Sequence, residues 1–534
     1  MDTAPILEWL QATPQFHIIL ISILHVITWA YCLTLKGWVS DDIQGIAAFS
    51  DRLINDKKID SYEIELGGKK LQIKNTAWNK ALPFPSNFMR WSRLNWGKSF
   101  RSLGKDSKGH TIYGWVQDAK KHHALNIVVQ WCNLILGYNI LSHFFGPSLA
   151  FFSMLLFAVH PCGVQTVGWI SGVNYCLSLL GTLLTLNAAL YINNVYILFP
   201  VIAITSIISC MTLLPGCFNF VILLYLGYHN AAIMAGIVGA YFLYRLGIET
   251  VNYRVSAFKE QQMGKSTGLY WRKIIIMVKT FWYYVRLVLF PKRLGLFHTW
   301  GYHFDAPIEH IDHEFWAGLV SLVVYWGVAI ISPAPVQFGL IWAFIYLLIF
   351  SNFITAQQFV SERYVYISIF GICIAVSYYL IAYPIIFSFI LGIFIMRIWV
   401  HLPTFQNEVR FYESNCFNFP QSEVAMGNLG VSYLNHGMHY KAFDTWHEAS
   451  RQNSLYDVPW YNLYSICKQN GDLQGAKKFL MMCLNASTIH FPDQWKKEMV
   501  ELDRLIQINI PIAEFSKRLN HAIKEGNYGS PGTF

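Results

Sequence analysis

The sequence predicts an all-α membrane protein that crosses the bilayer many times and ends in a domain of helical repeats. Three observations predict this class. Only 13% of the 534 residues are charged and 54% are hydrophobic, whereas soluble domains carry about 25% charged residues. The apolar residues fall in runs long enough to span a bilayer. The polar region after residue 401 repeats itself at an offset of 34 positions. A soluble enzyme, a disordered chain and a small disulfide-stabilised domain are therefore excluded.

The apolar runs define a membrane domain over residues 1–400. A helix needs roughly 20 apolar residues to cross ~30 Å of hydrocarbon. The first run is too long for a signal-peptide core and has no basic segment before it, so we expect it to stay as an anchor. We predict about eleven spans. They lie near residues 16–35, 124–145, 148–159, 169–191, 195–214, 218–246, 274–290, 315–331, 336–354, 364–381 and 385–400.

A long polar loop, residues 36–122, follows the first run. Within it, two alternating segments flank the dipeptide Gly67-Gly68. Alternation around a two-residue glycine link predicts a β-hairpin with a primed turn. The basic residues of this loop form a solvated face, which can also lie against anionic lipid headgroups.

The C-terminal domain, residues 401–534, carries the repeat. Asn428-Leu429-Gly430 recurs as Asn462-Leu463-Tyr464, 34 positions later. A helix–turn–helix period of 34 is typical of tetratricopeptide repeats. Residues 408–419 are expected to supply a preceding half-repeat and residues 494–506 a capping helix, which gives an α-solenoid suited to docking rather than catalysis. The same offset relates Gly437 to Gly471, Ala442 to Ala476 and Ala449 to Cys483.

Two adjacent carboxylates, Asp41 and Asp42, stand close to the end of the first span. Their mutual repulsion is expected to raise the pKa of one of them. A carboxylate so placed could take a proton from a hydroxyl acceptor or hold a divalent cation. The alternative is that Ser40 or Asp41 caps a helix over residues 43–53, where negative charge is favourable. Both interpretations stay open.

Other polar groups stand at the ends of later spans. His160 precedes Pro161, which ends a helix, so it is either a structural interfacial residue or part of a site. Glu362 and Arg363 begin another span. They could form an ion pair that tethers the helix end, or the planar guanidinium could hold a phosphate.

The order of these groups along the chain is more specific than any one of them. The groups are Asp41-Asp42, Arg90 with Leu94-Asn95, His123 with Asn126, His160-Pro161 with Val167, Trp169 and Ser171-Gly172, residues 284–291, Glu362-Arg363-Tyr364-Val365-Tyr366, and then the repeats. This order resembles the transmembrane, tetratricopeptide-containing O-mannosyltransferases and their bacterial relatives, within the GT-C glycosyltransferase fold. The resemblance covers most of the chain and is weakest over residues 51–78 and 227–268.

The resemblance implies a GT-C-like membrane domain and a transfer reaction. Members of the family take a sugar from a polyprenyl- or dolichyl-phosphate donor and pass it to a protein hydroxyl. By resemblance, Asp41 or Asp42 activates the acceptor in the first extracytoplasmic loop, and a divalent metal is permitted there without being required. A fixed cation neutralises the leaving phosphate, with Arg363 the first candidate and Arg90 behind it. The other donor-binding residues implied are His123, Asn126, His160 and Glu362.

The chain departs from the family pattern at four places. Gln165 stands where the family usually has Glu, and Gly172 is followed by Val173-Asn174 where Gly-Arg is usual. A common Lys-Glu pair has no equivalent near residues 211–216, and the usual His seven positions after His123 is Gln130. Buried charges in a membrane are costly and are normally kept for function, so neutral replacements are what a retired active site would show.

Two functions of different classes follow. One is a working glycosyltransferase that uses a lipid-linked sugar. The alternative is a catalytically degenerate relative that serves as a structural or assembly subunit of a membrane complex. Retention of Asp41-Asp42, His160 and Glu362-Arg363 favours the first, and the four neutral positions favour the second.

The assignment also predicts location and partners. With Asp41-Asp42 extracytoplasmic and an odd number of spans, the repeats lie on the same extracytoplasmic side as the site. The membrane would be a bacterial inner membrane or the endoplasmic reticulum. Expected partners are membrane lipids and, through the repeats, an acceptor protein or complex subunits, with no nucleic acid.

Overall fold

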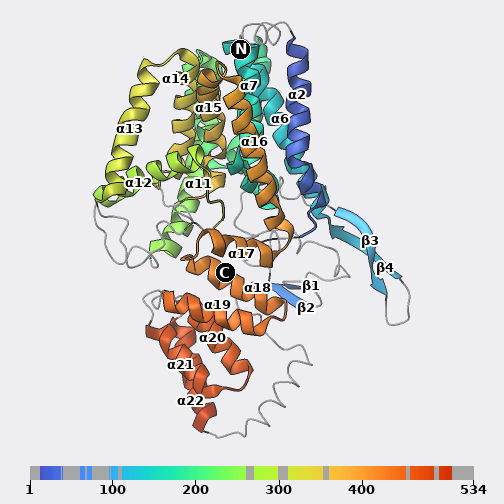
Figure 1. Ribbon diagram of the computed structural model, residues 1–534, viewed down its shortest axis with the longest axis vertical. Helices are drawn as coiled ribbons and strands as arrows, with labels where there is room; N and C mark the ends of the chain where they lie inside the picture. The colour runs from blue at the N-terminus through green and yellow to red at the C-terminus, as the bar shows by residue number, and fades with distance from the viewer. Residues whose placement is uncertain are drawn as a thin grey trace.

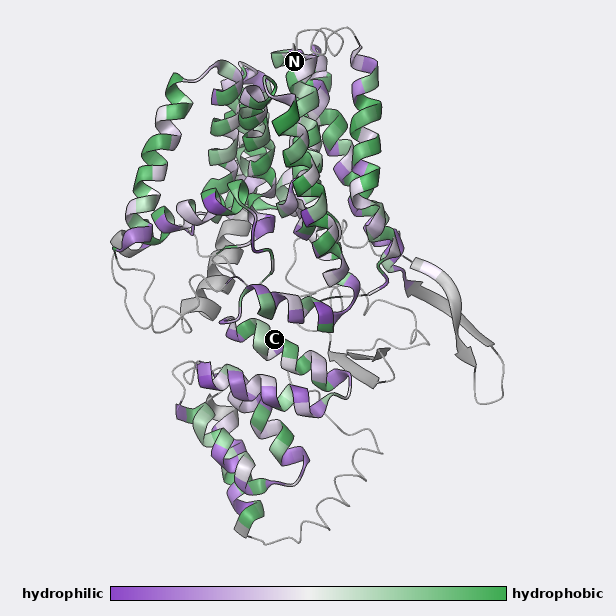
Figure 2. Cartoon of the chain, in the orientation of Figure 1, coloured by the Kyte–Doolittle hydropathy of each residue, from purple (hydrophilic) through white to green (hydrophobic). Residues whose placement is uncertain are grey.

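The computed structural model describes residues 13–37, 39, 61–66, 69–74, 96, 98–105, 111–259, 270–296, 298, 311–352, 360–452, 457–485 and 492–507. Upright helices form a bundle, and the helices after residue 401 lie beneath its foot (Figure 1). The upright helices are predominantly apolar, whereas the helices beneath them alternate polar and apolar residues (Figure 2).

The bundle makes this chain a multi-pass integral membrane protein. Within the described ranges, seven helices are long and apolar enough to cross a membrane, or eight when one bent pair counts as a span. Many of their large apolar side chains, Ile19 and Val323 among them, face outward, as lipid contact requires. The seven are α2 (Pro14–Trp29) with η1 (Ala30–Thr34), α6 (Ala119–Phe145), α8 (Val173–Tyr191) with η5 (Ile170–Gly172), α9 (Val195–Thr212), α13 (His313–Ile331), α15 (Glu362–Leu380) and α16 (Pro384–His401) with η8 (Leu402–Gln406).

The other four predicted runs do not form straight, full-length spans. The run at 218–246 is divided between α10 (Asn219–Tyr225) and α11 (His229–Lys259), with Gly227 at φ 84° between them. The run at 336–354 forms the shorter helix α14 (Ala334–Leu347) followed by η7 (Leu348–Phe350). Apolar content alone does not distinguish such pieces from a complete span.

The run at 274–290 forms α12 (Tyr270–Leu289), which lies across the foot of the upright helices (Figure 1). Basic side chains on α12 pair with the start of α13. The Nζ of Lys279 is 2.7 Å from Asp312, and Arg286 is 3.2 Å from Glu314. A helix with one apolar and one basic face suits the membrane interface better than its interior.

The run at 148–159 leads into a broken segment. Helix α7 (Pro147–Ala158) stops before Pro161, and the chain bends by 56°. It continues as η3 (Pro161–Gly163) and η4 (Val164–Gly168) before η5 and α8. Residues 158–170 are all buried, as irregular backbone at membrane depth must be. The segment folds tightly on itself, because a Cβ on Gly172 would lie 2.1 Å from the carbonyl oxygen of Gln165.

Two hairpins lie between α2 and α6. Strand β1 (Ser61–Leu66) pairs antiparallel with β2 (Lys69–Lys74), and Leu66 opposes Lys69. This register leaves the two-residue glycine link that the sequence predicts. A second hairpin, β3 (Lys98–Lys105) with β4 (Thr111–Gln117), was not anticipated from the sequence. It leads into α6 through Asp118, which accepts hydrogen bonds from the backbone of Lys120 and the hydroxyl of Ser99.

Beneath the bundle, two helical hairpins follow each other at the repeat offset. The first is α18 (Glu423–Asn435) with α19 (His439–Gln452), and the second is α20 (Asp457–Gln469) with α21 (Leu473–Asn485). Helix α17 (Glu408–Asn418) precedes them and α22 (Pro492–Gln507) follows. The matched small residues lie in the hairpin interfaces: Ala442, Ala449, Ala476 and Cys483 are fully buried.

The turns of both hairpins depend on glycine. Gly437 and Gly471 have φ of 76° and 79°, a region that costs other residues about 1–2 kcal/mol. We expect Gly437→Ala to lower the free energy of unfolding of this domain by about 1 kcal/mol. The matched control is Gly427→Ala, because Gly427 is helical and nothing lies within 4 Å of its Cβ position. That control should be neutral or slightly stabilising. Equal thermal unfolding midpoints for the two variants would contradict this account.

The repeats and the bundle meet through α17. The side chain of Asn415 accepts a hydrogen bond from the backbone N–H of Leu296 at 2.6 Å, and Asn418 donates to the carbonyl of Leu294 at 3.0 Å. The loop after α12 is thereby held against α17. Side chains of both regions share one hydrophobic core, with Phe411 and Tyr433 among its members.

Glu408, at the start of α17, gives this junction a pH dependence. Burial raises the pKa of Glu408 from 4.5 to about 7, and the charge of His436 offsets part of the shift. Below pH 4.5 the carboxyl is neutral in both folded and unfolded chains, whereas above pH 7 folding must bury its charge. We therefore expect Glu408→Gln to match the native chain near pH 4.5 and to exceed its stability by roughly 2–4 kcal/mol at pH 8. Thermal unfolding at both pH values measures this, and an equal difference at both would refute it.

Candidate functional site

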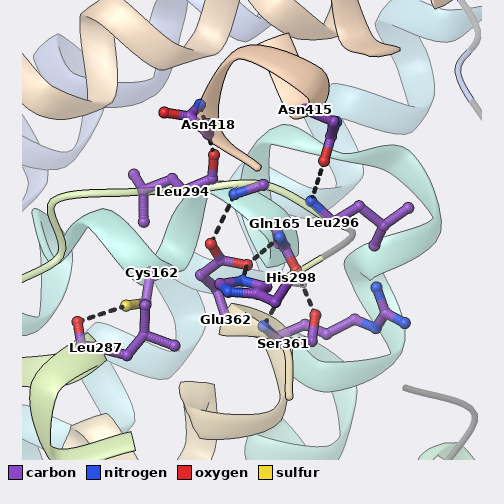
Figure 3. Close-up of polar contacts among 12 residues, drawn as sticks. Cys162, Gln165, Leu287, Leu294, Leu296, His298, Ser361, Glu362, Asn415 and Asn418 are labelled. Carbon is purple, nitrogen blue, oxygen red and sulfur yellow. Dashed lines mark hydrogen bonds and ion pairs between the residues drawn. The ribbon is translucent and has the colours of Figure 1, made fainter. Parts of the chain in front are cut away.

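Polar side chains from four elements meet at the foot of the bundle. They come from the broken segment, the first turn of α15, the loop after α12, and α17 (Figure 3). The centre of this cluster is the carboxylate of Glu362, which is 1% exposed. A buried carboxylate is tolerated only when hydrogen bonds and opposite charge replace the water that it loses.

Both oxygens of Glu362 have partners. Oε1 accepts a hydrogen bond of 2.8 Å from the backbone N–H of Gly295, and Oε2 lies 3.0 Å from Nε2 of His298. Oε2 also accepts a hydrogen bond from the side-chain amide of Gln165. Glu362 therefore joins three segments that lie far apart in the sequence.

The side chain of Gln165 suits its position beside Glu362 because its amide contains both a hydrogen-bond donor and an acceptor. Its nitrogen donates to Glu362, while its oxygen accepts from the Ser361 hydroxyl at 2.8 Å and from the backbone N–H of Arg363 at 3.4 Å. The family resemblance predicts Glu at this position, yet a carboxylate could not donate to Glu362. The neutral amide thus fits the network around it.

His298 and Tyr283 are two site residues that the sequence did not reveal. The hydroxyl of Tyr283 lies 2.6 Å from Nδ1 of His298, whose ring also packs against Phe419 at 4.4 Å. Burial, followed by the charge of Glu362, raises the pKa of Tyr283. No motif includes either residue, because His298 is one histidine in a polar loop and Tyr283 is one aromatic on an amphipathic helix.

Arg363 and the start of the first loop contact the same tryptophan, Trp169. Its guanidinium lies 5.4 Å from the ring centre of Trp169 and 5.2 Å from that of Tyr364. The indole N–H of Trp169 donates to the carbonyl of Val39 at 3.3 Å. Val39 comes two residues before Asp41 in the sequence. One tryptophan therefore contacts both the candidate phosphate-binding cation and the chain that leads to the candidate carboxylates.

His123 and Asn126 lie on the buried face of α6 beside this tryptophan segment. The amide of Asn126 donates to the carbonyl of Trp169 at 2.9 Å. Its oxygen and both ring nitrogens of His123 are buried and have no hydrogen-bond partner among the residues that the structure describes. Further along the same face lie Gln130, which accepts from Tyr366, and Asn133. The face offers buried polar atoms that a polar ligand could use.

His160 is occupied within the protein. The backbone N–H of Cys162 donates to its Nδ1 at 3.3 Å, and its Nε2 donates to the carbonyl of Val288 at 3.1 Å. These bonds fix the broken segment to the end of α12. This conformation leaves neither ring nitrogen for a donor phosphate.

Some predicted residues are not placed beside the others. Asp41, Asp42 and Arg90 lie outside the described residues. Asn174, at the position where the resemblance predicts Arg, is exposed. Within the described ranges, no three or more His, Cys, Asp or Glu side chains gather as a metal site would require.

Comparisons with known proteins identify no relative: no protein-family model, no curated protein and no solved structure matches this chain.

Proposed function

We propose that the protein is a membrane glycosyltransferase that transfers a sugar from a polyprenyl- or dolichyl-phosphate donor to a protein hydroxyl. The observation that carries this proposal is the arrangement of Val39, Trp169 and Arg363. It holds the start of the first loop, which leads to Asp41-Asp42, and a buried cation against the same side chain at the foot of the bundle. A donor on a lipid carrier requires its reacting phosphate to lie at the membrane boundary, with its apolar chain between spans.

Each candidate residue has a role in this proposal. Asp41 or Asp42 takes the proton of the acceptor hydroxyl as general base. Arg363 neutralises the phosphate that leaves, since a guanidinium matches phosphate oxygens. The unpartnered polar atoms of His123 and Asn126 fit hydroxyl or phosphate groups of the donor, whereas Glu362 and Gln165 position Arg363 through the backbone of α15. The carboxylate pair permits a divalent metal without requiring one.

A second function, a structural or assembly subunit, is favoured by a different observation. Glu362, Gln165 and His160 are satisfied by groups of the protein itself. A site whose polar groups bind one another can persist for stability after catalysis is lost. In either case we propose that the helical hairpins are tetratricopeptide repeats that dock an acceptor protein or complex subunits. They would do so on the extracytoplasmic face of a bacterial inner membrane or the endoplasmic reticulum.

Turnover by the purified protein distinguishes the two functions. The protein, in lipid nanodiscs with its co-purified partners, is incubated with isotope-labelled polyprenyl-phosphate sugars. We expect transferred or released label in the native chain and a loss of at least about 100-fold in Asp41→Asn/Asp42→Asn. The matched control is Asp444→Asn, which changes a carboxylate on α19, far from the proposed site in the sequence. If no sugar donor supports turnover by a folded native chain with its partners bound, the transferase is excluded in favour of the subunit.

A further inference from the structure

We infer that Lys292, Arg293 and Arg397 form a binding site for the headgroup phosphate of an anionic phospholipid, and that the bound lipid stabilises the loop after α12. The three residues are called the basic site below. It lies where the chain that follows α12 meets the lower end of α16 (Figure 1). The basic site is independent of the proposed transferase reaction, and it depends only on the membrane placement of the bundle.

Arg397, near the end of α16, brings the three basic residues together. Nη2 of its guanidinium donates to the carbonyl of Pro291 at 3.4 Å and to the carbonyl of Lys292 at 2.5 Å. The Lys292 carbonyl belongs to the peptide bond that joins Lys292 to Arg293, so the guanidinium lies against the backbone of both residues. The Nε of Arg397 is buried and has no hydrogen-bond partner among the described residues. The guanidinium therefore keeps a donor for a further acceptor.

The positive charge of the basic site is not balanced by a carboxylate. Within the described part of the chain, none of its three residues forms an ion pair. Glu362 binds Gly295, two residues after Arg293, but its oxygens are held by the Gly295 N–H and the Gln165 amide. Backbone carbonyls are neutral and leave the charge of Arg397 in place. Like charges repel one another, so three of them in one short stretch favour a bound anion.

The surroundings of the basic site indicate that this anion is a lipid. Leu289 and Phe290 come directly before Pro291 and are exposed, Phe290 to 75%. On α16, Ile393 and Val400 stand four residues before and three after Arg397, which places them on the same face, and both are exposed. Exposed apolar side chains on a membrane helix contact acyl chains. A phospholipid can lay its acyl chains along these residues and its phosphate on the basic site, because Arg and Lys both bind phosphate.

The loop that carries Lys292 and Arg293 joins the bundle to the repeats. The N–H of Gly295 donates to Glu362 at 2.8 Å, and the N–H of Leu296 donates to Asn415 on α17 at 2.6 Å. A headgroup that binds two side chains at the start of this loop restricts its movement. Opening of the two hydrogen bonds then requires loss of the lipid, so lipid binding should slow that opening.

Lipid binding to the full-length protein in detergent tests the basic site. Dioctanoyl phosphatidylglycerol is titrated against the delipidated protein and followed by native mass spectrometry, with dioctanoyl phosphatidylcholine as the zwitterionic comparison. We expect saturable binding of phosphatidylglycerol, at least about tenfold weaker in Lys292→Gln/Arg293→Gln because two charged contacts to phosphate are lost. Inorganic phosphate at the same concentration should not displace the lipid.

The matched control is Lys496→Gln/Lys497→Gln, an exposed lysine pair on α22 whose loss changes the net charge equally. It should bind phosphatidylglycerol like the native chain. Equal affinity of the two double variants for this lipid would overturn the basic site. Equal affinity of the native chain for both lipids would overturn its preference for an anionic headgroup, and displacement by inorganic phosphate would overturn the assignment to a lipid.

Hydrogen–deuterium exchange in the same samples tests the effect on the loop. With phosphatidylglycerol at ten times its Kd, the amides of Gly295 and Leu296 should exchange about tenfold more slowly than with phosphatidylcholine. Lys292→Gln/Arg293→Gln should show no such slowing, and the amides of the α20–α21 hairpin should be unaffected in every chain. Exchange at Gly295 and Leu296 that is the same with both lipids, or slowed equally in the variant, would overturn the inferred stabilisation.

Discussion

Replacing Gln165 by Glu should destabilise the protein by about 3–5 kcal/mol at pH 8, because it puts a second carboxylate beside buried Glu362. The native amide donates to Glu362 and accepts from Ser361 and the Arg363 backbone. An ionised Glu at position 165 can still accept hydrogen bonds from Ser361 and the Arg363 backbone, but it cannot donate one to Glu362. Two carboxylates so close in a buried site cannot both stay ionised. The loss should therefore be largest at high pH and should diminish near pH 5, where one of them can bind a proton.

The thermal unfolding midpoint of the purified protein at pH 5 and pH 8 measures this effect. Gln337→Glu is the matched control, since Gln337 on α14 donates to the carbonyl of Ile330 at an exposed position. An exposed change of this kind should stay within about 0.5 kcal/mol. Comparable stability of the two variants at pH 8 would mean that Gln165 is not the amide that satisfies Glu362.

Replacing Gly37 by Ala should displace the start of the first loop. The Cβ position of Gly37 lies 1.7 Å from the carbonyl oxygen of Gln406, which is backbone and cannot rotate away. The two segments must separate, at a cost of at least about 1–3 kcal/mol. Val39, two residues later, then loses its register with Trp169. If the carboxylates that follow serve as base, a shift of this kind should reduce turnover by about 100-fold.

The matched control for this change is Gly392→Ala on α16, where nothing lies within 4 Å of the Cβ position. It should leave both the unfolding midpoint and turnover unchanged. Native turnover in a folded Gly37→Ala variant would show that the contact between Gly37 and Gln406 does not position the first loop.

Sequence patterns predicted the parts of this fold that depend on periodicity. The full-length spans follow from apolar runs of sufficient length, the β1–β2 hairpin from alternation around Gly67-Gly68, and the helical hairpins from an offset of 34. The same patterns could not show that the run at 274–290 lies across the bundle. The orientation of this helix depends on the ion pairs that Lys279 and Arg286 form. Their partners, Asp312 and Glu314, lie at the start of the next helix and cannot be identified from the helix's own sequence.

The site was predictable only where residues stand in a recognisable order. Asn126 and Arg363, two residues of that order, both contact Trp169, and their role in a donor site stays a prediction. His298 could not be inferred, because its importance comes from contact with Glu362, 64 positions away. The role of Gln165 was likewise hidden. In the sequence, Gln165 stands out only as a neutral residue where the resemblance predicts Glu. In the fold, its side-chain amide donates a hydrogen bond to the buried carboxylate of Glu362.

Binding of a lipid-linked sugar to the protein in nanodiscs tests the central proposal most directly. An isotope-labelled polyprenyl-phosphate sugar is titrated against the native chain, Arg363→Gln and Arg410→Gln, the last being an exposed arginine on α17. The account predicts saturable binding to the native chain and to Arg410→Gln, and at least about tenfold weaker binding to Arg363→Gln, as expected for loss of a charged hydrogen bond. Equal affinity in all three chains, or no saturable binding to the native chain, would contradict it.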